Sequence, residues 1–70
     1  MSGNQERVLK WFKSHKGRAI TLDDAGRIFN MHHNTFTKVF SVLRQLGHAL
    51  ATEWRKNPIT GRWYKVYFMH

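Results

Sequence analysis

The sequence predicts a small α+β domain in which three short helices precede a C-terminal β-hairpin. Apolar residues recur at helical spacing in three segments, and two later runs rich in β-branched and aromatic residues flank an Asn-Pro-Ile-Thr-Gly loop. Seventy residues leave room for one domain with one modest core, and no cysteine is present to cross-link it. The helices are expected at about 4–15, 22–29 and 33–46, and the hairpin at about 48–69, within a single domain 1–70.

The first helix carries one apolar stripe, which consists of Val8, Leu9 and Phe12 with Trp11 at its edge. Asn4, or Ser2 with a frayed start, is expected to cap its N-terminus, and Gly17 to form its C-terminal cap. Residues 18–20 are too short to assign from the pattern, but they are compatible with a single β-bridge.

The second helix has a defined start and stop. The Thr21 hydroxyl can accept a hydrogen bond from the Asp24 amide while the Asp24 carboxylate accepts one from the Thr21 amide, which is the pattern of a capping box. The helix should end near Phe29 because Asn30 tolerates the left-handed conformation of a sharp turn. Its apolar face is expected to hold Leu22, Ala25, Ile28 and Phe29.

The third helix is amphipathic and should end at Gly47, which suits a left-handed cap. At 100° per residue, one side carries the predicted core residues Phe36, Val39, Phe40, Leu43 and Leu46. The opposite side carries the polar residues Asn34, Lys38, Ser41 and Gln45. We therefore expect one buried face and one polar face.

The hairpin has suitable turn chemistry, because Pro58 fits the second turn position and Gly61 fits a positive φ. In the first strand, alternation favours the Leu50 and Trp54 face toward the helices. The second strand is apolar on both faces, so its buried face stays open. The aromatics expected in the core are Trp11, Phe12, Phe29, Phe36, Phe40, Trp54 and Phe68.

The charge balance points to an anionic partner. Twelve lysines and arginines oppose four acids, which gives a net charge of +8 and a pI near 10.7. Glu6, Asp23 and Asp24 are expected in the first turns of helices, where they complement the helix dipole. A domain this basic is typical of nucleic-acid binders. No membrane-spanning run or secretion signal is visible, so a cytoplasmic location is expected.

Two runs of the sequence carry a family resemblance. The run Gly26-x-x-Phe29-Asn30-Met31-x-x-x-x-Phe36-x-x-Val39 resembles a helix-turn-helix, with Gly26 where alanine is usual and Asn30 where glycine is usual. Both replacements keep the required close helix contact and left-handed turn. Residues 43–54 and 61–67 resemble small winged helix-turn-helix proteins of bacteriophages and prophages. The resemblance covers about residues 18–69.

This resemblance implies that the third helix enters the major groove of double-stranded DNA and that the hairpin is a basic wing along the phosphates or the minor groove. Asn34 would pair with adenine, and Lys38 would donate to guanine or to a phosphate. The expected recognition-helix contacts are His32, His33, Asn34, Thr35, Thr37, Lys38, Ser41 and Gln45. The expected wing and backbone contacts are Arg18, Arg44, Arg55, Lys56, Asn57, Arg62 and Lys65.

The expected function is sequence-specific binding of double-stranded DNA by a small phage or bacterial transcriptional regulator, or by an excisionase-like architectural factor, near the nucleoid. A chain this small covers one half-site, so a homodimer or cooperative side-by-side binding is expected. The alternative is a winged-helix adaptor that binds a host protein through an exposed patch of Trp63, Tyr64 and Tyr67. RNA or an anionic membrane is supported by charge alone.

The sequence does not suggest an enzyme. No nucleophile is paired with a base and no glycine-rich phosphate loop is visible. Asp23 and Asp24 are better explained by helix capping than by a nuclease centre. His32 and His33 are adjacent at a helix start, where their side chains should diverge, so no metal site is expected. We expect no cofactor.

Overall fold

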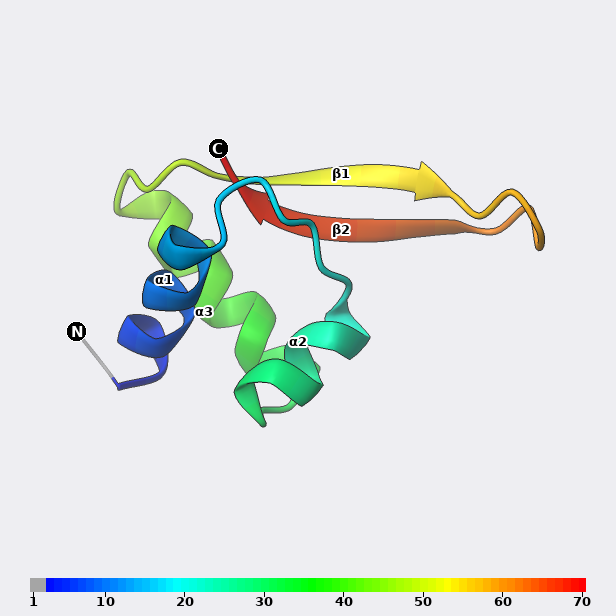
Figure 1. Cartoon of the computed structure of the whole chain (residues 1–70). Coiled ribbons are helices and arrows are strands. Elements are labelled where there is room, and N and C mark those ends of the chain that lie inside the picture. The colour runs from blue at the N-terminus through cyan, green and yellow to red at the C-terminus, as the bar shows by residue number, and fades with distance from the viewer. Residues whose placement is uncertain (1–2) are drawn as a thin grey trace.

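The computed structural model describes residues 3–70 and shows three helices followed by a two-stranded antiparallel hairpin (Figure 1). The elements are α1 (Gly3–Ser14), α2 (Leu22–Phe29), α3 (His33–Gln45), β1 (Leu50–Lys56) and β2 (Trp63–Met69). The predicted α+β order is confirmed, with α2 at the predicted residues and α1 and α3 within one residue of the predicted ends. No helix in this part of the chain is long and apolar enough to cross a membrane.

The local chemistry at the helix ends sets most of these boundaries. The capping box is present, because Thr21 Oγ1 accepts from the Asp24 N–H at 3.2 Å and Asp24 Oδ2 accepts from the Thr21 N–H at 3.2 Å. Asn30 ends α2 with a left-handed φ of 52°. The prediction that Asn4 caps α1 is wrong, because α1 begins at Gly3 and Asn4 lies within it. Ser2 lies outside the described residues.

Aromatic rings from all three helices and β2 pack against one another within the core. Phe29 and Phe36 stack with their centroids 5.8 Å apart, and Phe12 meets Phe40 edge to face at 5.8 Å. Tyr67 of β2 lies edge to face against both Phe36, at 5.2 Å, and Phe40, at 4.9 Å. Its burial raises the pKa of the Tyr67 hydroxyl above the ordinary value near 10 through desolvation. These contacts pack the end of the hairpin that is distant from its loop against the helices.

The strand register shows which face of the hairpin meets the helices. Leu50 pairs with Met69 and Thr52 with Tyr67, so these four side chains lie on one face. Leu50, Tyr67 and Met69 belong to the buried core, which settles the face left open for β2. The single bridge expected within 18–20 is also present, between Ile20 and the outer edge of β2 at Tyr67.

Several residues expected in the core lie outside it. Trp54 is on the predicted face, but it is 62% exposed because the far half of the hairpin projects beyond the helices (Figure 1). Phe68 points to the opposite face of the sheet and is half-buried outside the core cluster. Trp11 is half-buried and packs against the edge of the core.

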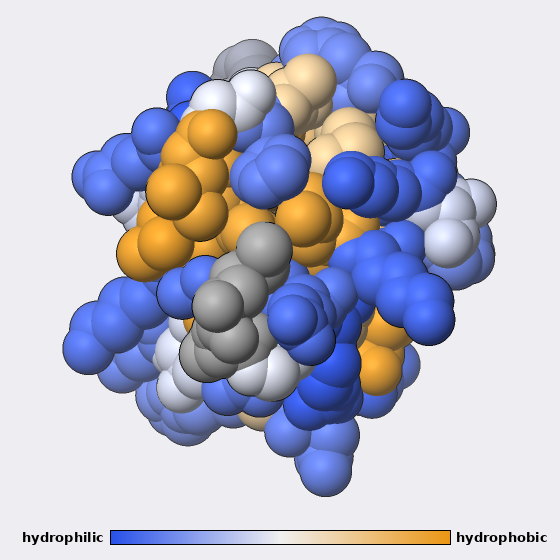
Figure 2. Space-filling view, turned by 90° about the vertical axis from the view of Figure 1, so that its left-hand side faces the viewer, coloured by the Kyte–Doolittle hydropathy of each residue, from blue (hydrophilic) through white to orange (hydrophobic). Residues whose placement is uncertain are grey.

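Two aliphatic residues of the helices are also more exposed than predicted. Leu46 follows the last residue of α3 and is 60% exposed, while Ile28 is 38% exposed near Trp11, outside the buried cluster. Figure 2, which views the molecule from the side away from the hairpin tip, shows an apolar strip bordered by hydrophilic side chains. The apolar pattern of the sequence is therefore not fully buried within this chain.

Candidate nucleic-acid interface

The turn between α2 and α3 holds the two helices in a fixed arrangement. Asn30 supplies the left-handed residue, and the Arg7 side chain of α1 donates a hydrogen bond to the Phe29 carbonyl at the end of α2. Met31 is half-buried against the core, and a Cβ added to Gly26 would lie 3.5 Å from the Met31 carbonyl oxygen. Helix α3 is thus positioned by packing, by the turn residue and by one side-chain hydrogen bond.

The outer face of α3 is the polar surface that the helical periodicity predicts. Asn34, Lys38, Ser41 and Gln45 are all exposed. Within residues 3–70, the side chains of these four residues make no hydrogen bond or ion pair. Their donors and acceptors are therefore free to meet a ligand.

The residues that flank this polar face differ in how available they are. Thr35 and Thr37 are half-buried, and the Thr37 hydroxyl donates to the Asn34 carbonyl at 3.0 Å. His32 caps α3, because its Nδ1 accepts from the Asn34 N–H at 3.2 Å. Arg44 is exposed near the end of the helix. His32 and Thr37 thus have roles inside the helix, while His33 and Arg44 remain accessible.

The two adjacent histidines lie closer together than predicted. Their ring centroids are 4.2 Å apart with the planes tilted by 30°, so the expectation that the side chains diverge is wrong. Residues 3–70 contain no group of three or more His, Cys, Asp or Glu side chains arranged to hold a metal ion. His32 caps α3, and both histidines are exposed.

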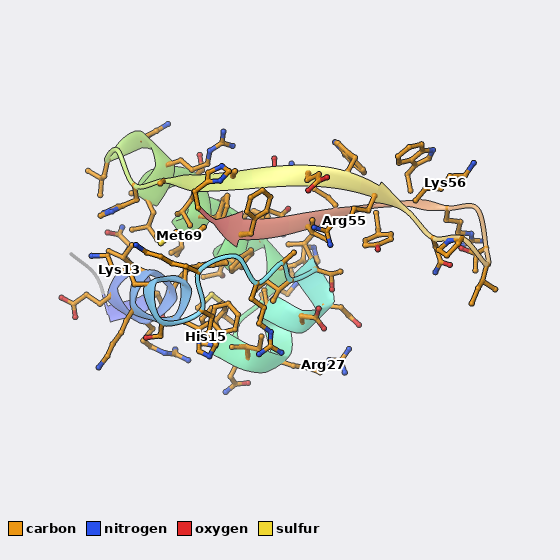
Figure 3. All side chains as sticks on the ribbon, turned by 45° about the horizontal axis from the view of Figure 1, so that its top comes forward. Lys13, His15, Arg27, Arg55, Lys56 and Met69 are labelled. Carbon is orange, nitrogen blue, oxygen red and sulfur yellow. The ribbon has the colours of Figure 1, made fainter. Side chains whose placement is uncertain are left out.

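Most of the positive charge is not neutralised within the chain. Two ion pairs form among the described residues, Arg27 with Asp23 at 3.1 Å and Arg55 with Glu53 at 3.5 Å, and both are well exposed. The other lysines and arginines of residues 3–70 have no carboxylate within ion-pair distance. Figure 3 shows labelled cations at both ends of the molecule, Lys13 on α1 and Lys56 near the hairpin tip. Exposed ion pairs are weak, so an anionic ligand can compete for these groups.

The distal hairpin, residues 53–65, carries many of the predicted backbone contacts, including Arg55, Lys56, Arg62 and Lys65. Its loop is ordered by internal hydrogen bonds: the Asn57 side-chain oxygen accepts from the Ile59 N–H at 2.9 Å, and the Asn57 carbonyl accepts from the Gly61 N–H at 2.8 Å. Asn57 is half-buried, so it organises the loop more than it faces solvent. The cations are therefore presented on a defined arm.

Arg18 lies apart from the other predicted contacts. Its guanidinium carbon is 5.8 Å from the centroid of the Trp11 ring, and the His15 ring stacks on the same ring at a centroid distance of 4.3 Å. Residues 18–21 run along the edge of β2 through the Ile20 bridge. Arg18 is thus part of a cluster beside α1, and the structure does not bring it to the polar face of α3.

The predicted aromatic patch on the hairpin is not one surface. Tyr67 is buried in the core, and the register places Tyr64 on the opposite face of the sheet from Trp63. The exposed aromatic residue on the same face as Trp63 is instead Trp54, which was predicted to lie in the core. The sequence contained one indication of this exposure. A hairpin with its loop at residues 57–62 pairs Trp54 with the charged residue Lys65.

Comparison with protein-family models, curated proteins and solved structures found no match to this chain.

Proposed function

We propose that this protein is a winged helix-turn-helix domain that binds double-stranded DNA with sequence preference. The observation that carries the proposal is the outer face of α3, where four exposed polar side chains have no partner within the described chain. The second helix of a tightly packed helix pair is the element that such domains place in the major groove, whose width admits an α-helix. The net charge of +8 supports a polyanionic ligand.

The side chains on this face suit the edges of base pairs. Asn34 offers one donor and one acceptor from its amide, which matches the N6 and N7 groups of adenine. Lys38 lies one helical turn further on and donates to guanine O6 and N7 or to a phosphate. Ser41 and Gln45 extend the same stripe toward the end of α3. Discrimination between sequences is therefore assigned to α3.

The distal hairpin supplies contacts to the phosphate backbone. Arg55, Lys56 and Arg62 are exposed on an arm that projects past α2, and the Glu53 carboxylate is the only acid on that arm within the described chain. These cations neutralise phosphates and position the protein without reading bases. With roughly five phosphates neutralised, the slope of log affinity against log salt is expected near −4.5.

A single copy presents one recognition helix, so it covers one half-site. The biological role that follows is that of a small phage or bacterial regulator, or of an architectural factor that acts by occupying DNA. Two copies on an inverted repeat, or several side by side, would give a full site. A selection of bound duplexes from a random pool reports this directly, because a palindromic consensus indicates a symmetric pair.

The test compares the affinities of variants for the selected duplex over a series of salt concentrations. Asn34→Ala is expected to weaken binding by about 1–3 kcal/mol and to relax the preference at one base pair. Lys38→Ala is expected either to do the same or to reduce the salt slope by about one unit. Lys13→Ala is the matched control, because it removes another exposed lysine, on α1 instead of α3. Equal binding of random and selected duplexes by all four proteins, wild type included, would refute the proposal.

A further inference from the structure

Two tryptophans lie exposed on one face of the distal hairpin. Trp54 is 62% exposed and Trp63 is 63% exposed. Trp54 pairs with Lys65 and Trp63 pairs with Lys56, so the four side chains lie on one face of the sheet. The tryptophans occupy one diagonal of this arrangement and the lysines the other. We call this surface, formed by Trp54, Lys56, Trp63 and Lys65, the Trp–Lys face.

Both indole rings are open to a ligand. Within residues 3–70 neither ring makes a contact with another aromatic ring, whereas most other aromatic side chains do. Lys65 Nζ lies 5.9 Å from the centroid of Trp54 and 5.6 Å from that of Tyr67, which is cation–π range. This contact places an ammonium group over the Trp54 ring, while Trp54 as a whole remains 62% exposed.

The fold itself gives no reason for two tryptophans at these positions. The core cluster includes Leu50, Tyr67 and Met69 but neither tryptophan. The start of α2 borders Trp54 and Lys65 across a shared hollow without covering Trp54, and the hairpin projects beyond the helices from there (Figure 1). Large exposed aromatic side chains in a small protein indicate an interaction site when they are gathered on one surface. The lysines that alternate with the tryptophans narrow the class of partner. The indole rings favour planar groups and the lysines favour negative charge, so a ligand that combines both is expected.

We propose that the Trp–Lys face binds single-stranded nucleic acid, with unpaired bases stacked on Trp54 and Trp63 and phosphates held by Lys56 and Lys65. Bases within a duplex have their faces covered by neighbouring pairs, so unpaired bases alone can stack on the two rings. Diagonal positions on a sheet are about 7–8 Å apart, which suits two bases that follow one another along an extended strand. This activity uses a different surface from the α3 stripe and does not require sequence preference.

Titration of the wild-type protein tests the proposal without any substitution. The probes are an oligothymidylate of about 12 nucleotides and an abasic oligomer of equal length and charge, with tryptophan fluorescence as the readout. We expect tighter binding to the oligothymidylate, accompanied by quenching of the emission. Equal binding to both oligomers would overturn the proposal, since it would show charge attraction alone. A face adapted to a protein partner would also show no preference between them.

Variants then assign the contact. Trp54→Ala and Trp63→Ala are each expected to weaken oligothymidylate binding by about 5- to 150-fold, and the corresponding phenylalanine variants to lose less. Tyr64→Ala is the matched control, because Tyr64 lies on the same strand and faces the opposite side. Unchanged affinity in both alanine variants, or an equal loss in Tyr64→Ala, would refute the assignment.

Asn34→Ala distinguishes this site from the duplex site. It is expected to weaken duplex binding and to leave oligothymidylate binding unchanged, so failure of one proposal does not imply failure of the other. Loss of oligothymidylate binding in Asn34→Ala, with both tryptophans intact, would place the single strand on α3 and overturn the Trp–Lys face as its site.

Discussion

Replacing Gly26 by alanine is expected to stabilise the protein. Gly26 lies in the interior of α2 and has no positive φ, so its backbone conformation suits any L-residue. The added Cβ would meet the Met31 carbonyl oxygen at 3.5 Å, which is ordinary van der Waals contact. Alanine is favoured over glycine in a helix by about 0.8–1 kcal/mol because it loses less backbone entropy on folding. The free energy of unfolding should therefore rise by about 1 kcal/mol.

Thermal unfolding followed by circular dichroism measures this change. In a domain of this size, about 1 kcal/mol raises Tm by roughly 4–8 °C. Gly47→Ala is the matched control, because Gly47 has a φ of +96° and nothing within 4 Å of an added Cβ. Gly47→Ala should lower the free energy of unfolding by about 1–2 kcal/mol, because alanine is strained in the left-handed conformation, and Tm should fall. A lower Tm for Gly26→Ala would refute the reasoning, because it would show that the α2–α3 contact requires a glycine.

Further predictions concern the start of α2 and the buried tyrosine. Thr21→Ala removes one half of the capping box and should lower the free energy of unfolding by about 1 kcal/mol, measured by urea denaturation; Thr21→Ser should retain most of it. Burial raises the pKa of Tyr67, so the native state keeps its proton longer than the unfolded state and stability should fall as pH rises above about 10. Denaturation at about pH 9 and about pH 11 should show a smaller fall in Tyr67→Phe than in wild type. An equal alkaline loss in wild type and Tyr67→Phe would contradict this account.

The turns and most of the helix ends were predictable because their causes are local; the start of α1, where Asn4 was expected as the cap, is the exception. The Thr21–Asp24 capping box, the left-handed Asn30 and the positive φ of Gly61 depend on residues a few positions apart. The polar stripe of α3 was predictable for the same reason, since the helical period alone assigns Asn34 and Lys38 to the side opposite Phe36. The candidate duplex-binding face could therefore be located from the sequence.

The wrong predictions of burial for Trp54, Leu46 and Ile28 have a different cause, which is coverage by distant elements. Alternation placed Trp54 on the same face as Leu50, and the register confirms this, but no helix reaches far enough to cover Trp54. Ile28 lies in the last turn of α2 and Leu46 directly follows α3. Burial of a side chain at a helix end depends on whether another element packs against that end. Periodicity specifies the direction of a side chain and not the presence of another element in that direction.

The sequence by itself determined the order of the elements, the chemistry of their ends and the polar face of α3, since each follows from backbone preference and periodicity within one segment. The tertiary structure decided that Tyr67 joins the core while Trp54 and Trp63 remain in solvent. That division depends on the length of the hairpin relative to the helices, which is a relation between segments far apart in the chain. The Trp–Lys face becomes visible once that relation is known.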